Sequence, residues 1–318
     1  MESRAVLIAG PTASGKSALA IALAQRRHGV VINADSMQLY EDLAILTARP
    51  SEREQRGVPH RLFGVRDAAR PCSAAAWEAM ATAEIEAAWA KDRLPILVGG
   101  TGLYFRALLE GLADIPAIPP FVREQTRRER LEAGAGALHR RLAALDPGMA
   151  ARLEPGDGQR IARALEVIRT TGRSLAAYQA ERRPGGLAEA ERAGRIVKAV
   201  LEMPRETLAR RAERRFEAML EAGAPQEVAR LAARRLDPEL PAMKALGVPA
   251  LMRYLGGEIS QPEATAEAVR QTRRYIKRQQ TWMATQFPDW RRLDATDPDK
   301  ALATLERALD APERKEQA

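Results

Sequence analysis

The sequence predicts an α/β protein: a parallel sheet flanked by helices, with a helical insertion and a mainly helical C-terminal part. Strand-like and helix-like segments alternate along the first hundred residues, which is the pattern of repeated βα units. The proline-rich stretch 115–120 then stops regular structure. Only helical patterns follow it until an apolar run returns at residues 196–201, so the sheet is expected to be interrupted and later resumed.

The first element is a short apolar strand, Val6–Ala9, that runs directly into a glycine-rich loop. The loop fits G-x-x-x-x-G-K-[ST], and the residues after it, 17–24, indicate a helix. Strand, loop and helix together predict a P-loop-type core, in which backbone N–H groups and the helix N-terminus hold a polyphosphate. The expected anion site is Gly10, Pro11, Thr12, Ala13, Ser14, Gly15, Lys16 and Ser17, with the Ser17 hydroxyl as a ligand of Mg²⁺. The loop does not specify a nucleotide.

Two more strands are expected to end beside this loop. Val30–Asn33 leads into a second motif, Asp35-Ser36-Met37-Gln38-Leu39-Tyr40, and a helix is predicted at Ala74–Lys91 from its apolar spacing. Leu94–Val98 then leads into the glycine-rich segment 99–104, which contains Thr101. Because the carboxyl ends of parallel strands meet at one edge of a sheet, all three motifs can face one crevice.

The proline-rich stretch suggests a domain boundary. We predict a catalytic core of residues 1–116 and 196–318, and a helical insertion domain of residues 117–195. Helices are expected within the insertion at 121–133, 136–145 and 158–171. After the strand Ile196–Leu201, the expected helices are Arg205–Ala222, Ala224–Arg235, Ala242–Leu255 and Glu263–Thr285. The charged tail after Asp299 is expected to be peripheral.

Composition constrains the class of protein. The 318 residues are 46% hydrophobic and carry a net charge of +8, which permits a polyanionic partner. Cys72 is the single cysteine, so no intramolecular disulfide can form. Neither a secretory signal nor an apolar run long enough to span a membrane is seen, and we expect a cytoplasmic protein without a membrane partner. Nothing in the sequence demands a protein partner or more than a monomer.

The last long helix is predicted to carry a basic face, which is a more specific sign of an RNA partner than the net charge, although a run of charges is also typical of a solvent-exposed helix face. Its residues recur at helical spacing: Arg270, Arg273, Arg274, Lys277, Arg278 and Thr281. Val269, Ile276 and Met283 form a separate apolar seam, and no acidic residue lies between Val269 and Met283. Such a face fits contacts to RNA phosphates.

Five motifs together give the chain a family resemblance. GPTASGKS, DSMQLY, GGTGLYFRALLEGL, QRIARALEVIRTTG and TRRYIKRQQTW occur in the same order as in bacterial tRNA dimethylallyltransferases, and the resemblance extends from about residue 5 to residue 290. It implies transfer of a dimethylallyl group from dimethylallyl diphosphate to N6 of the adenine beside the anticodon of tRNA. Mg²⁺ would assist, and no ATP would be hydrolysed.

The resemblance also implies roles for single residues. Asp35 would be the general base, and Thr101 would bind near the junction of diphosphate and allyl group. An arginine of the helix 205–222 would reach the diphosphate; we take Arg211, with Arg215 as the alternative. The implied tRNA contacts are Ser36, Met37, Gln38, Arg123, Gln159, Arg160, Ile161, Ala162, Arg163, Lys277, Arg278, Gln279, Thr281 and Trp282.

The residues by themselves leave other interpretations open. Asp35 and Ser36 can cap a helix, and so can Thr101. Whole-protein alternatives are a prenyltransferase acting on free adenine nucleotides, a P-loop kinase of a small metabolite, and a nucleotide-switched RNA-binding protein. The chain also departs from the family pattern: Arg61 stands where a second histidine is usual, and Val248-Pro249 replaces an aromatic and a basic residue.

Overall fold

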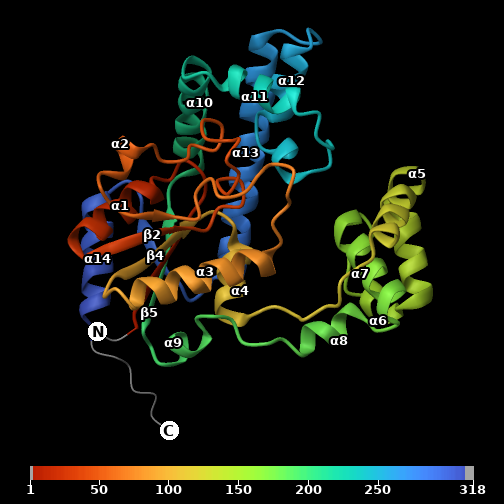
Figure 1. Ribbon diagram of the computed structural model, residues 1–318, viewed down its shortest axis with the longest axis horizontal. Coiled ribbons are helices and arrows are strands. Elements are labelled where there is room, and N and C mark those ends of the chain that lie inside the picture. Colours follow the sequence, from red (N-terminus) through yellow and green to blue (C-terminus); the bar gives the residue numbers. More distant parts are fainter. Residues whose placement is uncertain (1–2, 312–318) are drawn as a thin grey trace. The chain divides into compact units, whose positions relative to one another are not determined.

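The computed structural model describes residues 3–311 (Figure 1). Six strands in that range form one parallel sheet in the order β3-β2-β4-β1-β5-β6. The strands are β1 (Ala5–Ala9), β2 (Gly29–Asn33), β3 (His60–Arg61), β4 (Leu94–Gly99), β5 (Ile196–Glu202) and β6 (Arg291–Asp294). The four predicted strands are therefore confirmed. The two edge strands were missed, because β3 has two residues and β6 buries only Leu293.

Helices cover both faces of the sheet, and the side chains of β1 alternate between them. Val6 and Ile8 pack with the face formed by α1 (Lys16–Arg26) and α14 (Pro298–Asp310). Leu7 packs on the opposite face with α3 (Ala74–Trp89) and α4 (Gly102–Glu110). The α/β class is confirmed by this layered arrangement.

The C-terminal tail was wrongly expected to be peripheral. Helix α14 packs against α1, and the two lie side by side in Figure 1 although they come from opposite ends of the chain. Its apolar side has a helical spacing of Ala301, Leu302, Leu305 and Leu309, all buried in the core. The charged residues within α14 lie on the outer side of this amphipathic helix, and residues 312–318 of the tail lie outside the described range.

A third group of helices packs over the loop that follows β2. It comprises α10 (Arg205–Glu221), α11 (Ala224–Ala233), α12 (Val248–Leu255) and α13 (Gln261–Gln286). The short helix α2 (Glu52–Gln55) lies between β2 and β3 in the chain and buries no residue. The predicted helix Ala242–Leu255 is wrong at its start. A 3-10 turn, η1 (Pro241–Lys244), comes first, and Gly247 then takes a φ of 89°, which interrupts the helical path before α12.

The helical insertion forms a compact unit of residues 110–185 with its own apolar core. Its helices are α5 (Pro120–Leu145), α6 (Pro147–Ala150), α7 (Gly158–Thr171) and α8 (Leu175–Ala180). Helix α5 is broken at Gly134, whose φ of 76° separates the two helices expected from the sequence. The sequence placed the boundaries of this insertion at residues 117 and 195 from the proline-rich stretch 115–120. Ile118 of that stretch belongs to the core of this unit, and Ile115 packs against it.

The remainder of the chain, up to Leu109 and from Gly186, forms the sheet unit. Leu187 belongs to its core and precedes the short helix α9 (Ala188–Arg192). The backbone nitrogen of Leu187 donates to the carbonyl of Leu108 at 2.8 Å, so the chain leaves and rejoins this unit at one point. In the described part of the chain, no helix is both long and apolar enough to cross a membrane.

Candidate active site

The glycine-rich loop joins β1 to α1 and has the geometry of an anion cradle. Ala13 and Gly15 have positive φ values of 67° and 90°, which turn successive amide groups to one side. Gly15 is the N-cap of α1, and no side chain caps this helix end. The amides of the first turn therefore remain available to a ligand, with the helix dipole favouring negative charge.

Two cations accompany the loop. The Lys16 ammonium donates to the carbonyl of Pro11 at 3.3 Å. Burial lowers the pKa of Lys16 to about 8, while the charge of Asp35 opposes this shift and that of Arg215 adds to it. The guanidinium of Arg215, from α10, donates to the Thr12 hydroxyl at 2.5 Å. Lys16 and Arg215 thus bring positive charge to the loop from two elements.

A cavity of about 460 Å³ opens beside these groups. Lys16, Ser17, Arg211 and Arg215 line it together with the backbone of Ala13 and Gly15. The sequence left open which arginine reaches the loop: Arg215 makes the hydrogen bond, and Arg211, one turn earlier on α10, faces the same cavity. The cavity is therefore lined by several positive groups, as an anion requires.

Asp35 is fixed at the end of β2 by its neighbours. The fully buried Asn33 side chain accepts from the Asp35 nitrogen at 2.8 Å and donates to the Asp35 carbonyl at 2.9 Å. The Asp35 carboxylate accepts from the Met37 nitrogen at 3.0 Å, and turns rather than a helix follow it. The alternative that Asp35 caps a helix is therefore wrong.

Asp35 also interacts with charged and polar groups of other elements. Its negative charge raises the pKa of Lys16 and of Arg215, although burial lowers the pKa of both. Burial, and then the charge of Asp35, raises the pKa of the Tyr275 phenol on α13. The Asp35 carboxylate thus lies close enough to interact electrostatically with the lysine of the loop, with an arginine of α10 and with a tyrosine of α13. Sequence reasoning had not singled out Tyr275.

Thr101 links the third motif to the second. Its hydroxyl accepts from the Ser36 nitrogen at 3.0 Å and donates to the Ser36 hydroxyl at 3.3 Å. A side chain at Gly99 would place its Cβ 2.0 Å from the carbonyl oxygen of Ala34, so this approach requires glycine. Thr101 also precedes α4, and its carbonyl accepts from the Tyr104 nitrogen at 2.9 Å. The expected meeting of motifs at the strand ends is thus observed for Ser36 and Thr101.

Helix α13 presents two different sides near this centre. The predicted RNA contacts Lys277, Arg278 and Thr281 are exposed, as are the other cations of the basic face, Arg270, Arg273 and Arg274. The face is not wholly unpaired, because Glu213 of α10 bonds Arg273 at 2.9 Å. Arg278 lies 5.6 Å from the Tyr275 ring centre.

Two other predicted RNA contacts of α13 are directed into the protein. Gln279 is 5% exposed and bonds to the two glycine-rich loops rather than to solvent. Trp282 is half-buried against Gly102, where an added Cβ would lie 1.8 Å from the indole ring. The Gln279 side chain therefore faces the protein interior rather than an RNA, and the Trp282 ring packs on Gly102.

The other predicted RNA contacts differ in how far they reach the surface. In the helical unit, Arg123, Gln159 and Arg160 are exposed, and Ala162 and Arg163 are half-buried. Ile161 is fully buried in the core of this unit, so its side chain faces away from any partner. Beside Asp35, the amide of Gln38 donates to the carbonyls of Thr47 and Ala48, at 2.8 and 3.1 Å.

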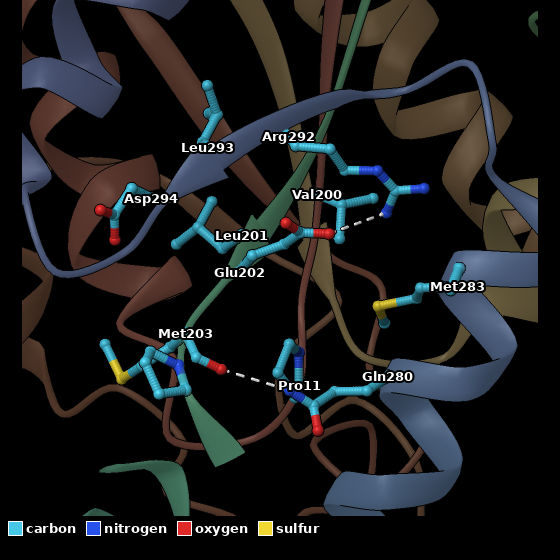
Figure 2. Close-up of a pocket in the computed structure, with 12 residues that line it drawn as sticks. Pro11, Val200, Leu201, Glu202, Met203, Gln280, Met283, Arg292, Leu293 and Asp294 are labelled. Carbon is cyan, nitrogen blue, oxygen red and sulfur yellow. Dashed lines mark hydrogen bonds and ion pairs between the residues drawn. The ribbon is translucent and has the colours of Figure 1, made fainter. Parts of the chain in front are cut away.

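A second cavity, of about 640 Å³, lies at the ends of β5 and β6 next to Pro11 (Figure 2). The Glu202 carboxylate pairs with Arg292 at 3.5 Å, and Gln280 of α13 donates to the Met203 carbonyl at 3.2 Å. Met203 and Met283 add apolar surface. Gln280 therefore anchors α13 to the chain after β5, while the preceding Gln279 anchors it to the glycine-rich loops.

Comparisons with known proteins agree with one another. The model of the IPP transferase family matches residues 38–286. The tRNA dimethylallyltransferase of Azorhizobium caulinodans is 55% identical over 305 residues, or 96% of each chain. That of Rhodopseudomonas palustris is 52% identical over 96% of this chain and 94% of its own.

Solved structures extend the likeness to three dimensions. The tRNA isopentenylpyrophosphate transferase of Bacillus halodurans is 31% identical, with a TM-score of 0.67 and 97% of both chains covered. A eukaryotic dimethylallyltransferase, described as acting on tRNA, is 26% identical with a TM-score of 0.80 and covers 99% of this chain and 81% of its own. The family match includes α13 but begins at residue 38, after the glycine-rich loop and Asp35, whereas the relatives and solved structures cover nearly the whole chain. The chain belongs to the IPP transferase family.

Proposed function

We propose that this chain transfers a dimethylallyl group from dimethylallyl diphosphate to N6 of the adenine adjacent to the anticodon in tRNA, releasing diphosphate. The observation that carries the proposal is the joining of three motifs at the strand ends. Asp35 lies in the electrostatic range of Lys16, and Thr101 is bonded to Ser36. Relatives that are about half identical carry the name tRNA dimethylallyltransferase, which supports the same assignment.

The donor side of the reaction fits the cradle. The C–O bond of the allylic diphosphate breaks, and its electron pair leaves with the diphosphate. Amides of the first turn of α1, the Lys16 ammonium and the guanidinium groups of Arg211 and Arg215 stabilise the charge that develops there. Closely placed positive groups act strongly on such charge where they are buried, as Lys16 is.

The acceptor side needs a base. N6 of adenine forms the new bond to carbon and loses a proton, which the Asp35 carboxylate accepts. Asn33 and the Met37 nitrogen hold Asp35 in place, while Thr101 borders the same segment through Ser36. An adenine stacked in an RNA loop cannot enter such a crevice, so the base leaves its neighbours before it reacts.

The residues present also fit Mg²⁺. Ser17 offers one hydroxyl at the start of α1, and the described residues contain no cluster of three His, Cys, Asp or Glu side chains able to hold a metal. Magnesium is commonly held by one or two protein ligands together with substrate phosphates and water. When bound, it would neutralise charge on the diphosphate.

The polymer substrate is favoured over free nucleotides by the surface of the protein. Exposed cations on α13 and the exposed Arg123, Gln159 and Arg160 of the helical unit offer phosphate contacts that a mononucleotide cannot use. These residues supply the tRNA contacts in our proposal, together with Ser36, Met37 and Arg163.

One experiment separates the alternatives. The protein is incubated with Mg²⁺, labelled dimethylallyl diphosphate and either an undermodified tRNA pool, an anticodon stem-loop or AMP. We expect label in both RNAs and little in AMP. Equal labelling of AMP would indicate the free-nucleotide enzyme, and ATP turnover with a small metabolite would indicate a kinase. No labelling of any acceptor would leave a nucleotide-switched RNA-binding protein and contradict the proposal.

A further inference from the structure

One side chain of α13 ties together the two glycine-rich loops. The Gln279 amide oxygen accepts from the Thr12 nitrogen at 2.9 Å, and its amide nitrogen donates to the Gly100 carbonyl at 3.1 Å. Thr12 belongs to the loop after β1, and Gly100 to the loop after β4. Both hydrogen-bonding functions of the buried amide are thus used by backbone groups of the two loops.

The contact is close on the Gly100 side. A Cβ at Gly100 would lie 2.1 Å from the Gln279 amide nitrogen, so no larger residue fits there while Gln279 keeps its position. The residue that follows Gly100 is Thr101, whose hydroxyl bonds Ser36. The residue held on the other side, Thr12, receives Arg215 through its own hydroxyl. Gln279 is therefore hydrogen-bonded directly to the loop that holds the proposed diphosphate site and to the loop that carries Thr101.

We propose that Gln279 is a positioning residue: it fixes the P-loop against the Thr101 loop and so aligns the leaving diphosphate with the reacting amine. It acts through Thr12 and Gly100, and it touches neither RNA nor donor. The alignment role rests on the proposed function, whereas the link between the loops does not. Because small displacements of reacting groups cost large factors in rate, loss of this link affects turnover more than binding.

The test uses two substitutions and a matched control in the full-length protein. Gln279→Met has a similar volume and removes both hydrogen bonds, while Gln279→Glu keeps an acceptor for Thr12 and loses the donor to Gly100. The control is Gln280→Met. Gln280 lies on the same helix as Gln279, and its amide bonds the Met203 carbonyl rather than a glycine-rich loop. Thermal unfolding of each variant verifies that it folds, and Gln279→Leu, which also removes both hydrogen bonds, replaces Gln279→Met in both readouts if the latter does not fold.

The first readout is kinetic. Both Gln279 variants should lower kcat about 10-fold or more, as expected for a buried hydrogen bond left unmade, while the Kd for an anticodon stem-loop stays within about twofold of the original. Gln280→Met should keep its kcat. A Gln279 variant with unchanged kcat, or one whose main defect is a raised Kd for RNA, overturns the proposal; the second result would make Gln279 an RNA contact.

The second readout needs no turnover. Amide hydrogen exchange at Thr12 should become faster in Gln279→Met and stay slow in Gln279→Glu and Gln280→Met, because only the first loses the acceptor of that amide. Equal exchange in all variants would refute the link between the loops. If the original protein prenylates no acceptor while the exchange pattern appears, the proposed function fails and the link stands.

Discussion

The hydroxyl of Thr101 lies 3.0 Å from the backbone nitrogen of Ser36 and also bonds the Ser36 hydroxyl, so these hydrogen bonds join two loops that follow different strands at the proposed reaction centre. Thr101→Val keeps the shape of the side chain and removes this acceptor. We expect kcat to fall about 10-fold, with the Kd for dimethylallyl diphosphate changed little, because the cradle lies in another loop. Single-turnover rates and equilibrium donor binding test this division. Donor binding that weakens in proportion to the rate would contradict it.

Asp35→Ala removes the proposed base. A positioned general base contributes about 10²–10⁴-fold, so prenyl transfer should fall by that range while pyrophosphate still binds. Asp35→Asn is the matched control for shape, since its amide oxygen can still accept from the Met37 nitrogen. Both variants should be equally slow in a labelled-donor assay. Near-normal turnover in Asp35→Asn would show that the carboxylate is not the base.

The lowered pKa of Lys16 predicts pH-dependent donor binding. Burial brings this pKa to about 8, below its usual value of 10.5, so the ligand-free protein loses the Lys16 charge as pH rises through 8. A bound diphosphate favours the charged form, and its affinity should therefore be full below pH 8 and weaken by up to about tenfold per pH unit above it. Calorimetry with pyrophosphate at about pH 7–9.5 measures this effect. Lys16→Ala should bind weakly at every pH and show only the titration of pyrophosphate itself, which makes it the control.

Arg211 and Arg215, which lie one turn apart on α10, form a natural pair of variants. Arg215 hydrogen-bonds the Thr12 hydroxyl, whereas Arg211 lines the cavity one turn away. Arg215→Ala should raise the Kd for dimethylallyl diphosphate by about 10- to 100-fold, because it removes a charged hydrogen bond from the loop as well as a positive charge. Arg211→Ala removes charge only and should have the smaller effect. If direct binding measurements show the larger effect for Arg211→Ala, Arg211 rather than Arg215 is the main diphosphate contact.

The basic face of α13 should act on RNA alone. Arg274→Ala combined with Lys277→Ala should raise KM for tRNA and flatten its dependence on salt, by about 0.7–0.9 in log–log slope for each RNA phosphate that is no longer neutralised. Donor affinity should not change. Arg273→Ala is expected to have less effect than either of these, because Glu213 already pairs with Arg273. An unchanged salt slope in the double variant would place the RNA elsewhere.

The sequence predicted the centre of the fold well because the central strands are continuous apolar runs. Edge strand β6 was not predicted, because three of its four residues are exposed and it lacks an apolar run. The packing of α14 was not predicted, because its many charges hid the helical spacing of Leu302, Leu305 and Leu309, which are buried. Asp35 and Thr101 could be placed near the P-loop because each closely follows the end of a predicted parallel strand. The sequence could not choose between Arg211 and Arg215, since that depends on how α10 is rotated against the loop.

The burial of Gln279 could have been predicted from its place on the helix. It follows the buried Ile276 by three residues and precedes the buried Met283 by four, so it lies in the apolar seam of α13 rather than on its basic face. A polar residue in such a seam must find partners inside the protein. Asn33 gives the same signal at the end of a buried strand, where it holds Asp35 and the Leu62 carbonyl.

The backbone hydrogen bond between Leu108 and Leu187 has a consequence for protein engineering and for evolution. Because these two backbone groups lie 2.8 Å apart, a short turn could join the chain at this point. The segment between them can therefore be removed or exchanged as one unit at a single junction. A gene can gain, lose or exchange such a unit in one event without breaking a strand of the sheet. If the helical unit contacts tRNA as proposed, chimeras made at this junction are expected to keep the donor chemistry of one parent and to take over RNA preferences of the other.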